Sequence, residues 1–133
     1  LKIFRNYLPV FQYELLDLST INIKDLQMSL AVKSILFAFQ NIKKFDDYDK
    51  LEQLFVLAAD LFNTKSDLKI IEKLLLFLYS SIELEPEKVK EKIDKVKPKK
   101  GELAMTTAEI LIEKGRKEGM EKGMEKGMEK GME

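Results

Sequence analysis

The stretch LKIIEKLLLFLYSSI, residues 68–82, decides the fold because its apolar side chains follow the period of an α-helix. Four of them recur at spacings of three and four residues and therefore share one helix face: Ile71, Leu74, Leu75 and Leu78. Apolar residues cover more than half of the circumference, so we expect this helix at the centre of the domain.

Two further helices are predicted before the central one. Residues 25–44 carry apolar residues at helical spacing and contain neither Gly nor Pro. A second helix follows the acidic start at 46–48 and has its apolar face at Leu51, Leu54, Phe55, Ala58, Leu61 and Phe62. Residues 63–67 form a turn, with Ser66 or Asp67 expected as N-cap of the central helix. Three antiparallel helices with short links predict a mainly α fold, a small helical bundle.

Residues 1–20 are expected to hold a short strand left from an upstream domain. Apolar residues alternate there with polar ones, the period of a strand, at Phe11, Tyr13 and Leu15. A single strand is not stable alone, so its partner is expected in sequence outside the chain. The chain begins at Leu1 and stops within a repeat at Glu133, which is typical of a fragment.

Residues 83–102 predict a short polar helix, with Pro86 well placed in its first turn. Its apolar stripe holds only three residues, Val89, Ile93 and Val96. Pro98 and Gly101 are expected to end it.

The same helix contains the one basic stretch of the chain. Seven lysines lie between positions 88 and 100, against Glu91 and Asp94. No Arg or aromatic residue accompanies them, which favours a solvated linker helix over a phosphate-binding surface. Residues 21–100 are thus interpreted as a helical bundle with a polar linker helix.

Residues 101–133 are interpreted as a capped helix that continues into a repeat. Thr106 and Glu109 have the spacing of a capping box, in which the Thr106 hydroxyl accepts from the Glu109 backbone N–H and the Glu109 carboxylate reaches back to accept from the Thr106 backbone N–H. Ala108, Leu111 and Ile112 would begin that helix.

The repeat itself is Gly-Met-Glu-Lys, with five glycines and four methionines at intervals of four residues. Four residues turn about 400° in a helix, so each column of the repeat drifts by about 40° per unit. Each Gly costs about 0.8–1 kcal/mol of helix stability relative to Ala. At least two of the three positions between successive glycines are charged, which excludes pairing inside a membrane.

Three interpretations of the repeat stay open: a marginal helix that pairs with a second copy, a solvated tail that frays, and a contact with nucleic acid. Six basic and six acidic residues cancel between positions 113 and 133, which disfavours the nucleic-acid contact. Pairing would use small Gly and adaptable Met at close approach. The residues expected in self-association are Leu111, Ile112, Gly115, Gly119, Met120, Gly123 and Met124.

Composition excludes several classes of function. The chain has no Cys and no His, which removes disulfides, thiolate metal sites and the commonest general base. Lys+Arg and Asp+Glu are both 23, so no net field attracts DNA or an anionic membrane. Apolar runs are far shorter than the roughly 20 residues of a membrane span. We expect a cytoplasmic protein without a membrane partner.

No catalytic, cofactor-binding or metal-binding residue is predicted within the chain. The only acidic-x-Lys pattern, Asp67 to Lys69, lies at a helix start and indicates a cap with an exposed lysine. Asp46, Asp47 and Asp49 lack the Gly and distal Glu of a calcium loop and indicate a charged helix entry.

Three segments taken together resemble a known family. They are VFQYELLDLS at 10–19, FLYSS at 77–81 and MTTAEILIEKGRKEGMEKGMEKG at 105–127. In this order they resemble the C-terminal half of the Rpn family, the recombination-promoting nucleases or putative transposases (YhgA-like) of the PD-(D/E)XK superfamily. The resemblance implies DNA cleavage by a longer parent protein with Mg²⁺ or a similar ion. The catalytic Asp and Glu-x-Lys/Gln strands of such proteins lie before the region matched here, so the nuclease core is absent.

The leading hypothesis is a non-catalytic accessory and oligomerisation region of such a nuclease, which meets DNA only through the missing core of its parent. An alternative is a stand-alone regulatory module that pairs with the full-length parent or another protein and inhibits it. Two others are a chain that itself cleaves DNA and a helical adaptor unrelated to nucleases.

Overall fold

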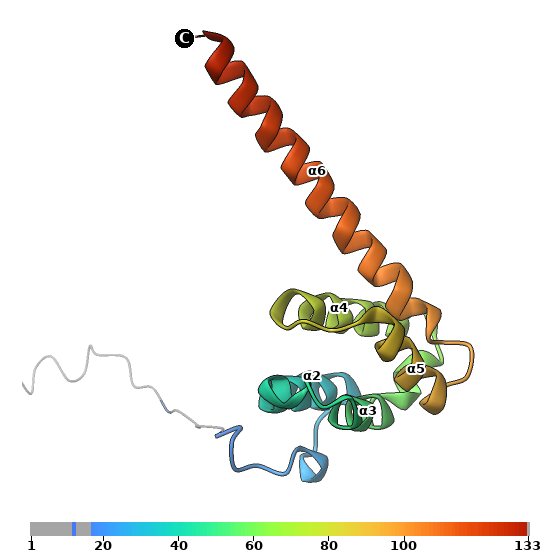
Figure 1. Cartoon of the computed structure of the whole chain (residues 1–133). Coiled ribbons are helices and arrows are strands. Elements are labelled where there is room, and N and C mark those ends of the chain that lie inside the picture. The colour runs from blue at the N-terminus through green and yellow to red at the C-terminus, as the bar shows by residue number, and fades with distance from the viewer. Residues whose placement is uncertain (1–11, 13–16, 133) are drawn as a thin grey trace, which may run out of the picture.

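The computed structural model describes residues 12 and 17–132 of the chain, without the side chains of Lys130 and Met132. The elements, in chain order, are the short 3-10 helix η1 (Ile23–Asp25), α2 (Leu30–Asn41), η2 (Ile42–Lys44), α3 (Tyr48–Leu57), η3 (Ala59–Phe62), α4 (Lys65–Ser81), α5 (Pro86–Val96) and α6 (Glu102–Met132). Figure 1 shows a small helical bundle from which α6 projects, so the predicted fold class is confirmed. The strand predicted at Phe11, Tyr13 and Leu15 lies outside the described residues.

The first predicted helix begins later than expected. Asp25 closes the 3-10 helix η1, and α2 starts at Leu30. Ser29 has extended backbone dihedrals and its hydroxyl accepts from the Val32 N–H at 3.3 Å. This N-cap satisfies one of the free amides at the helix start and fixes the boundary there.

The second predicted helix is divided in two. α3 ends at Leu57, and the last apolar positions of the predicted face continue in η3. Leu61 and Phe62 are nevertheless buried, as the periodicity indicated. The tighter turn of the 3-10 helix keeps both side chains directed at the core while the chain turns toward α4.

α4 has the buried face that the sequence predicted, because Ile71, Leu74, Leu75 and Leu78 are all buried. The N-cap, however, was predicted wrongly. Thr64, rather than Ser66 or Asp67, precedes the helix, and its hydroxyl accepts from the Asp67 N–H at 3.2 Å. Sequence alone could not separate three neighbouring residues that all cap well.

α5 is an integral part of the bundle, so the interpretation as a solvated linker helix is wrong. Val89 and Ile93 are fully buried. The helix packs against α3 on one side and against the start of α6 on the other. Pro86 occupies its first turn as expected. Two buried residues are enough to pack α5 into the bundle, because the neighbouring helices α3 and α6 contribute the rest of the apolar contact.

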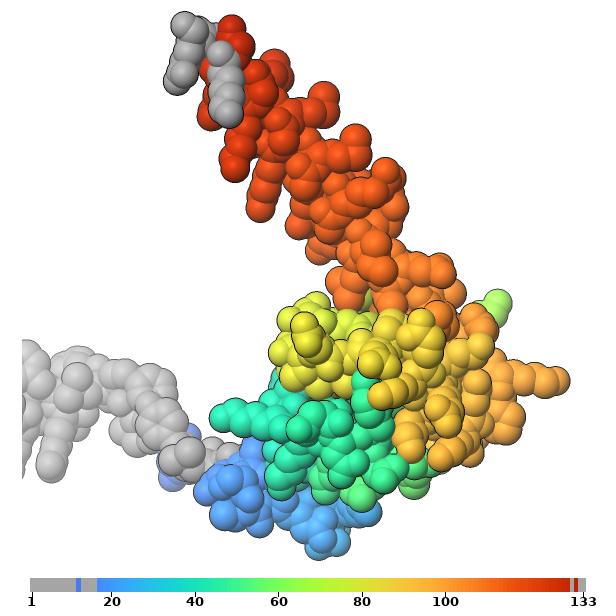
Figure 2. Space-filling view, viewed as in Figure 1, coloured from blue at the N-terminus to red at the C-terminus, as the bar shows by residue number. Residues whose placement is uncertain are grey.

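The core lies between α2, α3, α4 and α5 and is filled mainly by aromatic and aliphatic side chains. Phe45, Phe55 and Phe62 are its largest fully buried members. Figure 2 shows the resulting compact body with α6 extending away from it as a rod. The fold therefore presents one long helix whose outer part lacks contact with the bundle.

Candidate functional site

The turn that aims α6 depends on Gly101. Its N–H donates to the Asp94 carboxylate at 2.8 Å, which ties the turn to the end of α5. A Cβ on Gly101 would lie 2.6 Å from the carbonyl oxygen of Lys90, closer than real Cβ atoms approach backbone. Lys99, just before it, has a positive φ of 70°. Only glycine therefore allows the backbone of this turn to lie against α5.

The first turns of α6 are anchored in the bundle. Ala104 and Thr107 are buried, and the Tyr79 hydroxyl donates to the Ala104 carbonyl oxygen at 3.0 Å. Burial raises the pKa of Tyr79 to about 12. Lys90 of α5 pairs with Glu102 at 2.7 Å. These contacts hold the base of the helix rigidly on α4 and α5.

The capping box predicted at Thr106 and Glu109 is wrong. α6 already begins at Glu102, so Thr106 lies in its second turn. The Thr106 hydroxyl donates to the carbonyl oxygens of Glu102 and Leu103, both at 3.2 Å. The residue pattern matched, but the Gly101 turn starts the helix five residues earlier than a cap at Thr106 would.

Beyond Ile112 the helix leaves the bundle, and we call residues 113–132 the projecting segment. Every side chain from Glu113 to Glu129 is exposed. A Cβ placed on any glycine of the segment would meet no atom of the described residues within 4 Å. Met120, Met124 and Met128 are 58%, 68% and 70% exposed. At 1.5 Å per residue the projecting segment extends about 30 Å into solvent.

The structure places all seven residues predicted for self-association on one continuous stretch of α6. Leu111 is half-buried where the helix leaves the bundle, and Ile112 is 71% exposed. The other five, Gly115, Gly119, Met120, Gly123 and Met124, lie on the projecting segment. No part of the described bundle covers them.

The four residue types of the repeat form four rows along the projecting segment. Successive residues turn by about 100°, so the clockwise order seen from the helix N-terminus is Lys, Gly, Met, Glu, with Lys about 60° before Gly. Gly and Met thus share one side of the helix, called here the Gly–Met face. Lys borders this face beside the glycines, and Glu borders it beside the methionines.

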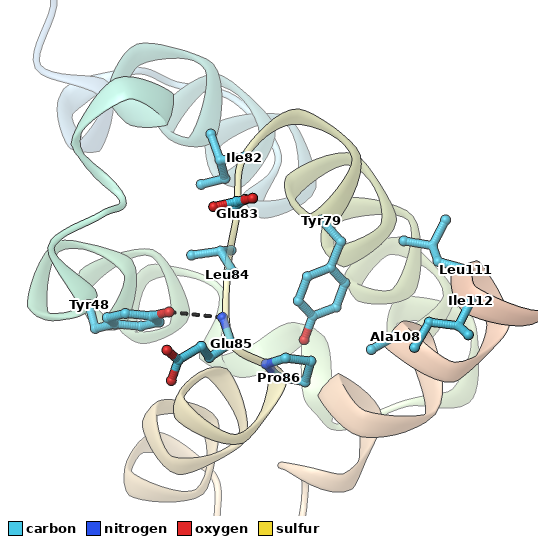
Figure 3. A pocket seen from close by; sticks show the side chains of 10 residues that line it. All are labelled: Tyr48, Tyr79, Ile82, Glu83, Leu84, Glu85, Pro86, Ala108, Leu111 and Ile112. Atoms are coloured by element: carbon cyan, nitrogen blue, oxygen red, sulfur yellow. Dashed lines mark hydrogen bonds between the residues drawn. The ribbon is translucent and has the colours of Figure 1, made fainter. Parts of the chain in front are cut away.

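A hollow lies where the projecting segment meets the bundle, as Figure 3 shows. Its wall on the α6 side consists of Ala108, Leu111 and Ile112. On the other side the Tyr48 hydroxyl accepts from the Glu85 N–H at 2.9 Å, which holds the loop before α5 in place. The hollow extends the apolar surface of Leu111 and Ile112 toward the bundle.

Four of the seven lysines of the basic stretch at 88–100 have acidic or amide partners in the described structure. The pairs are Lys88 with Glu85 at 3.5 Å, Lys90 with Glu102 at 2.7 Å, Lys92 with Asp49 at 2.9 Å and Lys97 with Asn63 at 3.2 Å. The hydrogen bond from Lys92 lowers the pKa of the Asp49 carboxyl group. Lysines that bridge α5 to its neighbours favour a role in packing over a role in phosphate binding.

The acidic residues that stood out in the sequence lie at the starts of helices. Asp47 is the N-cap of α3, where its carboxylate accepts from the Asp49 N–H at 3.0 Å. Asp67 lies in the first turn of α4. Among the residues that the structure describes, no group of three or more Asp or Glu side chains could hold a metal ion. In the same part of the chain, none of the helices combines the length and apolar character needed to cross a membrane.

Comparison with protein-family models, with curated proteins and with solved structures finds no match to the chain.

Proposed function

We propose that the chain is a non-catalytic helical module whose projecting segment pairs with a second copy. In this proposal it is the C-terminal accessory and oligomerisation region of a metal-dependent DNA endonuclease of the Rpn type. The bundle serves as the rigid base that aims α6 away from the rest of the protein.

One observation carries the pairing: α6 continues as a helix for about 20 residues without any contact to the described bundle. Five glycines cost this stretch about 4–5 kcal/mol relative to alanine. Helices in proteins are stabilised chiefly by packing of one face, and the projecting segment has no such packing against the part of the chain that the structure describes. A second copy supplies it, because burying Met is worth about 1.5–3 kcal/mol for a fully covered side chain.

The nuclease part of the proposal rests on the resemblance of the segments at 10–19, 77–81 and 105–127 to the Rpn family. DNA and a divalent cation such as Mg²⁺ would be bound by the catalytic core of the parent and not by this chain. A cytoplasmic location belongs to the same proposal, because the DNA of a bacterial parent lies there.

Sedimentation velocity of the purified chain tests the pairing. The chain is expected to shift from monomer to dimer between about 1 μM and about 1 mM, the range of weak specific pairs. The variant Met120→Ser with Met124→Ser should stay monomeric over this range. A matched control, Lys114→Ser with Glu118→Ser, changes two exposed side chains on the opposite side of the helix and should pair like the parent chain. A wild-type chain that stays monomeric at the highest concentration would overturn the proposal.

A regulatory role is the second candidate, because the same Gly–Met face recurs on any longer chain that carries this tail. The isolated chain would then pair with the full-length parent and reduce its DNA cleavage. Adding the chain in excess to an active parent nuclease measures this directly, and the Met120→Ser, Met124→Ser variant serves as the control. Equal cleavage with and without the chain excludes this role.

A further inference from the structure

The rows of the projecting segment carry information about how two copies meet. Gly forms a low row and Met a high row, about 100° apart around the helix. Each row repeats every four residues, which is the spacing of the ridges and grooves that pack helices in globular proteins. The Gly–Met face is therefore a groove beside a ridge on the same helix.

The direction of the second copy follows from the order of the rows. When two helices run parallel about a twofold axis, the clockwise side of one faces the anticlockwise side of the other. The Met ridge then meets the Gly groove of the partner copy, while Glu121 and Lys122, each about 130° from the centre of this contact, lie outside it. In an antiparallel pair, ridge faces ridge and groove faces groove. Shape therefore favours the parallel pair.

The crossing angle follows from the four-residue spacing. Rows at this spacing are inclined by about −26° to the helix axis, and two such sets interdigitate at a crossing of about −50°. A crossing of this size limits the contact to roughly two turns of each helix. The segment therefore forms one local crossing and no extended coiled coil, which would need a period of about 3.5 or 3.67 residues.

The position of the crossing is set by residues that interrupt the rows near the bundle. Leu111 occupies the Gly row and closes the groove at that end. Arg116 occupies the Met row and pairs with Glu113 of its own helix at 2.8 Å. The first intact groove and ridge lie at Gly119 and Met120.

We propose that a second copy of this chain packs on the Gly–Met face in parallel orientation, crossing at about −50° near residues 119–124. Met120 and Met124 of one copy then lie in the groove at Gly119 and Gly123 of the other. This inference rests on the proposed function, because it specifies the partner and the geometry of the same site.

Spin-label distances between copies test the orientation. The full chain has no Cys, so Glu109→Cys and Glu129→Cys each give a single labelling position on an exposed side of α6. A parallel pair predicts about 20 Å between the backbones at the two copies of position 109, and about 30 Å between position 109 of one copy and 129 of the other. An antiparallel pair predicts the reverse order, with about 35 Å between the two copies of position 109 and about 15 Å between position 109 of one copy and 129 of the other.

The outcomes separate this inference from the proposed function. The shorter distance between the two copies of position 109 supports the parallel pair. Association with the reversed order overturns the parallel pair while self-association stands. The absence of any distance between copies at concentrations near 1 mM, where weak pairs form, overturns both. Sedimentation of the labelled chains confirms in each case that the label has not altered association.

Discussion

Replacing two glycines of the Gly–Met face separates helix stability from pairing, because the two are expected to change in opposite directions. In the variant Gly119→Gln with Gly123→Gln, the added Cβ atoms meet no atom of the described residues within 4 Å. Gln is a good helix former, so the two changes should stabilise the isolated projecting segment by about 1 kcal/mol. The same side chains fill the groove in which the methionines of the second copy would lie.

The loss of pairing can be estimated from the exposed methionines. Met120 and Met124 are 58% and 68% exposed, so more than half of each side chain is available for burial. At about 1 kcal/mol for each of the four methionines in a pair, a blocked groove removes about 4 kcal/mol. This corresponds to close to a thousandfold weaker dissociation constant.

Circular dichroism at low concentration measures the helix content of the monomer, and sedimentation velocity of the same samples measures pairing. We expect higher helix content together with weaker association. The control Lys114→Gln with Glu118→Gln places the same residue type on the opposite side of the helix and should leave association unchanged. Association that strengthens along with helix content would refute the reasoning, since the glycines would then lie outside the contact.

Two further predictions concern the base of α6. Gly101→Ala should destabilise the fold by about 3 kcal/mol in urea unfolding, through overpacking against the α5 backbone and loss of the hydrogen bond to Asp94. The control Gly115→Ala, whose added Cβ meets no atom of the described residues within 4 Å, should cause no loss of stability. The pKa of Tyr79 is raised from 10.0, its ordinary value, to about 12 in the folded chain. The stability that Tyr79 contributes is therefore fully present below pH 10 and is lost as the pH rises to 12. Partial exposure reduces this contribution to about 1–2 kcal/mol, and Tyr79→Phe should remove this part of the alkaline slope in urea unfolding across that pH range.

The sequence predicts the faces of the helices well because burial of an amphipathic helix follows directly from its period. The face of α4 is buried as predicted, and Leu61 and Phe62 are in the core although their helix type changes. The caps were less predictable, since Thr64 competes with equally suitable neighbours and Thr106 has the right spacing inside a helix. The positions of these helix starts depend on contacts between residues distant in sequence or on the geometry of the backbone.

The role of α5 shows a different reason for failure. Its composition is dominated by lysine, which predicts a solvated surface when each residue is considered alone. Yet its lysines find acceptors on other elements, such as Asp49 on α3 and Glu102 on α6. Val89 and Ile93 then complete the core. Neither partner could be assigned from spacing, because both pairs span separations in sequence that only the fold brings together.

The candidate site, unlike the role of α5, could be predicted from the sequence alone. A repeat with a fixed period determines which residue types share a helix face, and no tertiary contact is needed for this. The same four-residue period would also limit the strength of the proposed contact between two copies. Each four-residue unit turns the Gly–Met face by about 40°, so units added beyond the proposed crossing would rotate away from the second copy and extend the helix without extending the contact. A repeat of seven residues would keep its seam on the partner along the whole length and make a permanent coiled coil. In the proposed pair a repeat of four residues would give a short crossing, and a short crossing would give an association that depends on concentration.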